Sequence, residues 1–189
     1  MQIIPLFPEF SHDVASRIEK AILKTRDGQI TADALLEAYS VIIGALFTEV
    51  SKNPRVKNIF DTQHSSVTGI KICFYIEKTT PWLLEVVPVP QVLAWSVTKN
   101  GAANELPGFA MDWATITAMI AGKSDTEMCY QAIVKRKIRT VNASSSNPAK
   151  GIRELFSFIG PVLDRKDVIE AAVKRGAPEI NLALNKLGC

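Results

Sequence analysis

The residues best suited to chemistry lie in one stretch, AIVKRKIRTVNASSSNPAKGIREL, which runs from Ala132 to Leu155. It contains no acidic residue before Glu154, and it carries the cations Lys135, Arg136, Lys137, Arg139, Lys150 and Arg153, which we call the basic tract. Lysine and arginine side chains bind phosphate oxygens, and the serines and asparagines between them can donate hydrogen bonds to the same atoms. The basic tract therefore predicts a binding site for nucleic acid, preferably RNA, or for another polyanion.

Part of the basic tract also has a structural explanation. The segment TEMCYQAIVKRKI has a helical pattern, so Lys135, Arg136, Lys137 and Arg139 are expected where a helix ends. The helix dipole favours a cation at that end by about 0.3–1 kcal/mol at best. Lys150 and Arg153 fall on the next expected helix, and the dipole does not account for them.

The basic character of the chain is confined to its last third. The net charge is +3 over 189 residues, but residues 1–122 hold 10 basic and 12 acidic side chains, whereas residues 123–189 hold 12 and 7. An excess of this size is also typical of a solvated helical surface. The charge distribution thus locates the most basic part of the surface without deciding what it binds.

Motifs for nucleotide binding or catalysis are weak. The GKS of residues 122–124 lacks the glycine that a phosphate-binding loop needs, because Thr117 stands in its place on a helical pattern. His12 and His64 are the only histidines. Asp61, His64 and Ser65 are near neighbours in one segment, whereas the members of a catalytic triad come from separate segments. The sequence predicts no catalytic residue, no metal site and no cofactor.

The middle of the chain offers an alternative site. Large aromatic side chains gather there and are able to line a pocket for a small molecule, although they are also typical of a core: Phe74, Tyr75, Trp82, Trp95, Phe109 and Trp113. Glu77 and Glu85 could approach each other across a hairpin and act as an acid and base pair. A small enzyme or small-molecule-binding protein that uses this segment, with Glu77, Glu85 or His64, is the alternative to polyanion binding.

The first half of the chain predicts two helices and then strands. Ser11 and Thr31 each precede a helical pattern, and Asn53-Pro54 closes the second helix ahead of a loop that contains DTQHSS. Residues 66–78 alternate as a strand does, with Ile70, Ile72, Phe74 and Ile76 on one face. Residues 82–100 are extended, and Pro88 and Pro90 predict an edge strand or a break there.

The second half of the chain is expected to be helical. Helices are predicted from Asp112, from residues 124–125, behind Asn147 with Pro148 in the first turn, from residues 164–166 to Gly176, and behind Pro178. The fold class is therefore α+β, mainly helical, with a small antiparallel β element in the middle of the chain. We expect a single domain over residues 1–189, with a possible hinge at 142–147 before a helical subdomain at 148–189.

The cysteines and the N-terminal residues favour an intracellular protein. Cys73, Cys129 and Cys189 are odd in number and contain no CxxC pair, which argues against a disulfide framework. Residues 1–14 lack the cationic region of a secretory signal, and no apolar run approaches the roughly 20 residues of a membrane span. We expect a cytoplasmic location and no transmembrane segment.

The expected function is non-enzymatic, because histidines are few and catalytic motifs are missing. The apolar segment Leu35–Phe47 and the extended segment Val86–Val97 also predict apolar surface that one chain does not cover, and hence a homo-oligomer. An assembly or interaction protein that contacts RNA fits these features. A viral or phage structural protein of nucleocapsid or matrix type would be an example.

Overall fold

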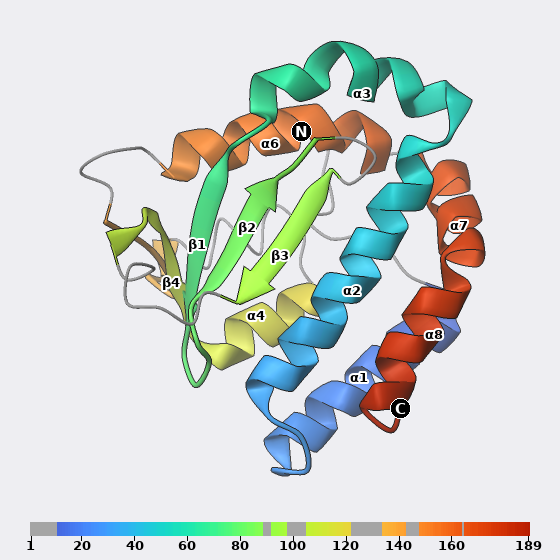
Figure 1. The fold of residues 1–189 in the computed structure, drawn as a ribbon. Coiled ribbons are helices and arrows are strands. Elements are labelled where there is room, and N and C mark those ends of the chain that lie inside the picture. Colours follow the sequence, from blue (N-terminus) through green and yellow to red (C-terminus); the bar gives the residue numbers. More distant parts are fainter. Residues whose placement is uncertain (1–10, 89–91, 98–104, 122–133, 143–147, 164) are drawn as a thin grey trace.

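The computed structural model describes residues 11–88, 92–97, 105–121, 134–142, 148–163 and 165–189. In chain order the elements are α1 (His12–Arg26), α2 (Ala32–Ser51), α3 (Pro54–Val67), β1 (Lys71–Ile76), β2 (Trp82–Val86), β3 (Leu93–Val97), β4 (Gly108–Met111), α4 (Trp113–Ile120), β5 (Ile138–Val141), α6 (Pro148–Leu163), α7 (Lys166–Arg175) and α8 (Ala177–Lys186). Figure 1 shows α2 between the sheet and the helices α1, α7 and α8, while α3 and α6 run across one end of the sheet. The mainly helical α+β class predicted from the sequence is confirmed.

Strand β1 is the centre of a five-stranded sheet with the order β3-β2-β1-β4-β5. Its pairing with β2 is antiparallel, as are the pairs β2–β3 and β4–β5, whereas β1 and β4 are parallel. The sequence predicted two or three antiparallel strands, so the structure extends this element by β4, β5 and one parallel pair. Strands of 4 residues such as β4 and β5 are too short to show a clear alternation.

The proline-containing segment after β2 breaks the chain as predicted. β2 ends at Val86, the chain resumes as a strand at Leu93, and β3 is an edge strand of the sheet. Pro88 lies in the break, because a proline has no backbone N–H to donate to a strand ladder. Pro90 lies outside the described residues.

The two faces of the sheet differ in burial. Ile72, Phe74 and Ile76 on β1 are all buried, as the alternation predicted, and the Ile70 and Ile72 side chains lie where Gly151 of α6 approaches the sheet. Cross-strand partners share a face, so Lys71, Tyr75, Ala110 and Arg139 lie on the opposite face. Lys71 and Arg139 are exposed there, Tyr75 and Ala110 are half-buried, and Cys73 on the same side of β1 is buried. We call this side of the sheet the second face.

Helix α2 is the most enclosed helix of the fold. Its buried residues lie around much of its circumference: Leu35, Leu36, Ala38, Tyr39, Ile42, Ile43, Leu46, Phe47 and Val50. They are covered by β3 on one side and by α7, α8, α1 and α3 on the others (Figure 1). The helix is long and apolar enough to cross a membrane by length and composition, but in this fold it is the core helix. This coverage removes one of the two reasons for expecting a homo-oligomer.

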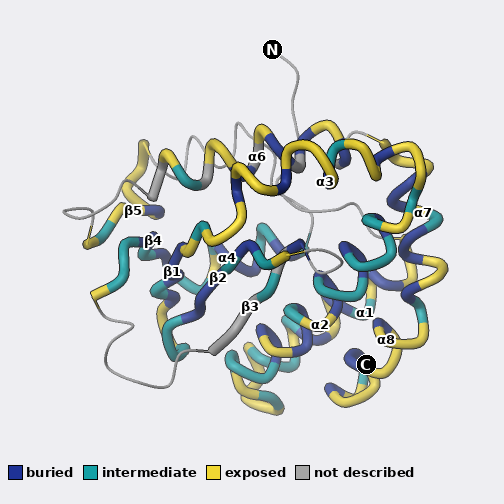
Figure 2. Tube along the Cα trace, turned by 45° about the horizontal axis from the view of Figure 1, so that its top comes forward, coloured by how far each residue is buried: buried dark blue, intermediate teal, exposed yellow. Residues whose placement is uncertain are grey.

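Helix α3 corrects the sequence prediction. Residues 61–66, DTQHSS, were expected in a loop, whereas they belong to a 14-residue helix. Asn53 caps it by accepting a hydrogen bond from the N–H of Arg55, and Pro54 occupies its first turn. The buried residues Val56, Phe60, His64 and Val67 recur at helical spacing, and this periodicity was the overlooked signal. Figure 2 shows that the outward sides of α3 and α6 are exposed.

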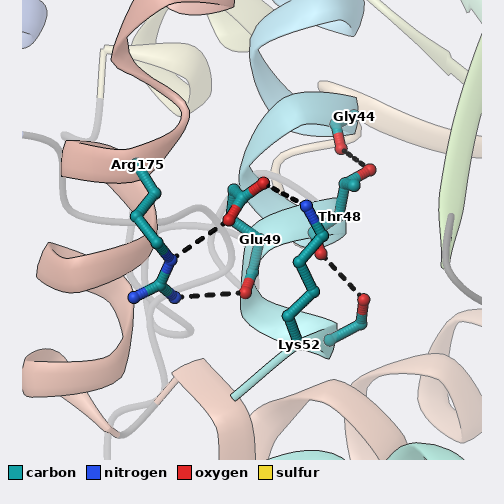
Figure 3. Close-up of polar contacts among 6 residues, drawn as sticks. Gly44, Thr48, Glu49, Lys52 and Arg175 are labelled. Carbon is teal, nitrogen blue, oxygen red and sulfur yellow. Dashed lines mark hydrogen bonds and ion pairs between the residues drawn. The ribbon is translucent and has the colours of Figure 1, made fainter.

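Polar contacts fasten the C-terminal helices to the first two. Arg17 on α1 donates to Asn185 and to the carbonyl oxygen of Cys189, at 2.8 Å each. In the last turn of α2, the carboxylate of Glu49 accepts from Arg175 at 3.1 Å and from Lys52 (Figure 3). The helices after the expected hinge therefore pack on the elements before it. Residues 143–147 lie outside the described residues.

Candidate polyanion-binding surface

The first four cations of the basic tract lie at the edge strand β5. The helical residue Val134 is followed by a turn at Lys135 and Arg136, a bend at Lys137, and then β5. The prediction that a helix continues to Ile138 is therefore wrong. Ile138, Thr140 and Val141 are β-branched and favour a strand, and β4 supplies the partner, with Ile138 opposite Met111.

Two residues in the left-handed region bracket β5. Arg136 has φ 58° and Asn142 has φ 53°. Asparagine tolerates this conformation, whereas for arginine it costs roughly 1–2 kcal/mol. The backbone of Arg136 thus has a conformation that glycine would adopt at a lower cost in free energy, yet the residue there is a long cation.

Lys135, Arg136, Lys137 and Arg139 are all exposed, and acidic neighbours compensate them only in part. No ion pair to Lys135, Arg136 or Arg139 is formed within the described residues. Asp112, the N-cap of α4, has a lowered pKa because it accepts hydrogen bonds from Thr115, and the nearby charge of Lys137 adds to that effect.

Lys150 and Arg153 form a separate group on α6. Both are exposed, and Lys150 pairs with Glu154 at 3.7 Å. Gly151, between them in sequence, lies where an added Cβ atom would meet Ile70 and Ile72, at the beginning of β1. β5 instead begins opposite Met111, and Met111 pairs with Ile76 at the end of β1. The length of β1, on the order of 20 Å, separates this group from Lys135, Arg136 and Lys137. The structure therefore does not gather the basic tract into one cluster.

The second face adds an aromatic side chain that sequence reasoning had not connected with the basic tract. Tyr75, Ala110 and Arg139 are successive cross-strand partners on β1, β4 and β5. The Tyr75 hydroxyl donates to the carbonyl oxygen of Leu106 at 2.7 Å and accepts from the Asn142 amide at 3.2 Å. Burial raises the pKa of Tyr75, so the hydroxyl stays protonated and keeps donating. Only the sheet register, which was not predicted, brings Tyr75 and Arg139 into one row.

His64 lies inside the protein between α3 and α6. The residue is 7% exposed, and its ring packs edge-on against Phe158 with 5.8 Å between ring centroids. The Thr68 hydroxyl donates to the His64 carbonyl oxygen at 2.9 Å and lies 2.9 Å from Nδ1, so Nδ1–H donates to that hydroxyl and Nε2 is an acceptor. Nε2 is buried and has no hydrogen-bond partner among the residues that the structure describes.

The other proposed catalytic groupings do not form. Glu85 lies opposite Lys71 and pairs with it at 3.1 Å, while Glu77 follows the far end of β1, so the two carboxylates are at opposite ends of the hairpin. Asp61 and Ser65 are exposed on α3, whereas His64 between them faces inward. Thr117 is buried on α4, and residues 122–125 of the GKS segment lie outside the described residues.

The aromatic residues of the middle segment are mostly core. Trp82, Phe74 and Phe109 are buried, and Trp113 packs against the core from α4. Of the cysteines, Cys73 is buried and burial raises the pKa of its thiol, while Cys189 is half-buried. Cys129 and the Trp95 side chain are outside the described part of the chain.

A hollow that the sequence did not predict lies where α1 begins, against α7 and α8. Its volume is about 600 Å³, its apolar walls include Val14, Val173 and Ile180, and Glu170 and Lys174 stand at its polar side. Within the described residues, no group of three or more His, Cys, Asp or Glu side chains is placed to hold a metal ion. Comparisons of the chain with family models, with curated proteins and with solved structures find no match.

Proposed function

We propose that this protein is a non-enzymatic interaction protein that binds RNA through the basic tract, with β5 and the turn before it as the main contact. One observation carries the proposal: Lys135, Arg136, Lys137 and Arg139 are all exposed within five consecutive residues. Such cations displace condensed counterions when they contact phosphates, which favours binding at low salt. Lys150 and Arg153 extend the contact to α6 for a strand long enough to reach both groups.

Cations on an edge strand also have a structural role, because they discourage pairing with the edge of another sheet. The two roles differ in what a substitution changes. If the cations only protect the edge, neutralising them lowers solubility and leaves RNA binding unaffected. If they contact phosphates, neutralisation weakens binding in a salt-dependent way.

The experiment is a salt titration of single-stranded RNA binding. Four phosphate contacts give a slope of log affinity against log salt of about −3, since each contributes about −0.7. The variant with Lys135, Arg136 and Lys137 all changed to Gln should flatten that slope by about 2 and weaken binding to all sequences alike.

The matched control changes Lys20, Lys174 and Lys186 to Gln, which removes the same charge from exposed positions on α1, α7 and α8. These helices lie across α2 from β4 and β5 (Figure 1). The control should keep the parent slope. Equal slopes for the parent and the basic-tract variant, or no binding by the parent near 100 mM salt, would contradict the proposal.

Self-association is part of the same proposal. β3 is the edge strand on the opposite side from β5 and belongs to the segment Val86–Val97, which remains the reason for expecting a homo-oligomer, so we place the contact with a second copy there. Sedimentation under reducing conditions should show a species larger than a monomer, with reductant present because Cys189 could otherwise link two chains. A monomer at all micromolar concentrations would remove the assembly part of the function.

A second candidate function rests on His64. A buried acceptor without a partner costs about 1–3 kcal/mol, and a bound molecule that donates a hydrogen bond would remove that cost. The ring contacts Phe158, which in turn packs against Phe60 with centroids 5.6 Å apart, so the fitting molecule is largely apolar with one hydroxyl or N–H donor. This is the small-molecule alternative, with His64 as its polar contact.

Native mass spectrometry separates the two functions. In the second function, the purified parent protein carries a bound small molecule and the His64→Phe variant does not. If neither protein carries added mass and His64→Phe melts at the same or a higher temperature, His64 serves packing alone, because replacing a buried unpaired polar group by an apolar one of similar shape is neutral or stabilising.

A further inference from the structure

The row of Tyr75, Ala110 and Arg139 on the second face has the composition of a surface for unpaired bases. Aromatic rings stack on bases of any sequence, and arginine contacts the backbone phosphates. Ala110 between them has a small side chain, so no long side chain of β4 stands between Tyr75 and Arg139 in this row. Tyr75 and Arg139 stand two strand spacings apart, about 10 Å, which a base and its adjacent phosphate can bridge.

The Tyr75 ring is held in place before any ligand arrives. Its hydroxyl is fixed by the Leu106 carbonyl at 2.7 Å and by the Asn142 amide at 3.2 Å, and Asn142 donates to the same carbonyl at 3.1 Å. A fixed aromatic ring loses little conformational entropy on binding. Tyr75 is half-buried as a residue, so part of it remains accessible.

We infer that the second face binds single-stranded rather than double-stranded RNA, with one base stacked on Tyr75 and the following phosphates on Arg139 and Lys137. This inference rests on the proposed RNA-binding function and names its ligand class. In a duplex the bases are stacked on one another and their faces are not available to a side chain. A single strand can turn a base out onto the ring.

The test compares a labelled 12-nucleotide oligouridine with a blunt RNA duplex of the same length, at one fixed salt concentration. Tyr75→Leu should bind the oligouridine about tenfold more weakly, because the stacked ring is lost. Tyr75→Phe retains the ring and should stay within about twofold of the parent. Neither variant should change duplex binding.

Cross-linking of the parent protein gives a readout that does not depend on a variant folding. Oligouridine carrying 4-thiouridine should cross-link under ultraviolet light within residues 72–78, the tryptic peptide that contains Tyr75. Fragmentation should place the adduct on Tyr75 and not on Phe74, which is buried on the other face.

The outcomes distinguish this inference from the proposed function. If Tyr75→Leu binds oligouridine as the parent does, or if the duplex binds as tightly as the single strand, the stacking surface is wrong while the basic tract can still bind phosphates. If the variant with Lys135, Arg136 and Lys137 changed to Gln keeps the parent salt slope, the proposed function itself fails. A parent protein that binds neither RNA overturns both.

Discussion

The carboxylate of Asp33 on α2 accepts a hydrogen bond from the indole N–H of Trp82 on β2, at 3.3 Å. The same oxygen accepts from the backbone N–H and the hydroxyl of Thr80, at 3.1 and 3.0 Å. Trp82 is 1% exposed, so its N–H cannot donate to solvent water instead. One carboxylate in the first turn of α2 thereby fixes the turn between β1 and β2 against the core helix.

Removing that carboxylate should be costly. Asp33→Ala removes the acceptor of the buried Trp82 N–H and of the half-buried Thr80 donors, and we expect the free energy of unfolding to fall by about 1–3 kcal/mol. Asp33→Asn keeps an acceptor oxygen and should lose less. Urea unfolding followed by tryptophan fluorescence measures both, with Asp27→Ala on the exposed end of α1 as the control. An Asp33→Ala variant as stable as that control would show that the contact contributes nothing.

Glu49 predicts a specific dependence of stability on pH. The hydrogen bond from Lys52 lowers the pKa of Glu49, and the contact with Arg175 lowers it further. A carboxyl group with a lowered folded-state pKa stabilises the fold fully above its unfolded value, about 4.3, and that stabilisation is lost as the pH falls through the folded value. Glu49→Gln should therefore cost about 1 kcal/mol or less at pH 7, and the difference from the parent should shrink below about pH 4.

The check is urea unfolding of the parent and Glu49→Gln at pH 7 and at successively lower pH. A double-mutant cycle with Arg175→Gln isolates the contribution of the ion pair drawn in Figure 3. A parent-to-variant difference that stays constant down to pH 3 would mean that the Glu49 charge has no part in stability.

Gly108 should be irreplaceable at the parallel pair. A Cβ atom at this position would lie 1.9 Å from the carbonyl oxygen of Cys73, and backbone cannot move aside as a side chain can. We expect Gly108→Ala to lower stability by about 3 kcal/mol or more, or to prevent folding. Gly151→Ala on α6 is the matched control, because its Cβ meets Ile70 at an ordinary 3.4 Å and alanine is favoured within a helix by about 0.5–1 kcal/mol. Thermal unfolding of the two variants tests the contrast; equal melting temperatures would contradict it.

Arg136 should show opposite effects on stability and binding. Glycine adopts φ 58° without the cost that arginine bears, so Arg136→Gly should raise stability by roughly 0.5–1 kcal/mol. The same change removes one phosphate contact and should reduce the salt slope of RNA binding by about 0.7. Calorimetry and the salt titration measure the two effects on one preparation. A variant that is more stable and binds RNA unchanged would place Arg136 outside the contact surface.

The helices and strands that were predicted correctly from the sequence are those that a local pattern of their own residues specifies. The stripe of Val14, Ile18 and Ala21 on α1, the buried face of β1 and the cap at Asp112 are local patterns, and the structure has each of them. The alternation on β1 fails only at Cys73, which is buried on the other face. α3 was missed because the residues between its regularly spaced buried positions are polar, and such residues are also common in loops. β5 was missed because a four-residue strand is specified by its partner β4, and no local pattern contains that information.

The candidate site shows the same limit. All six cations of the basic tract were identified from composition alone, and all are exposed. Their division into two groups, and the placing of Tyr75 in one row with Arg139, depend on the register between β1, β4 and β5. Such long-range pairings follow from the whole fold, so a reading of neighbouring residues cannot supply them.

The position of α2 has a consequence for how the protein is made. Its apolar surface is covered by α7 and α8, which are synthesised on the order of 100 residues later. At ribosomal rates of about 5–20 residues per second, α2 therefore leaves the exit tunnel several seconds before its covering helices exist. During that interval the apolar surface of α2 is uncovered in the nascent chain, which makes α2 a target for chaperones that recognise exposed apolar segments until the C-terminal helices arrive.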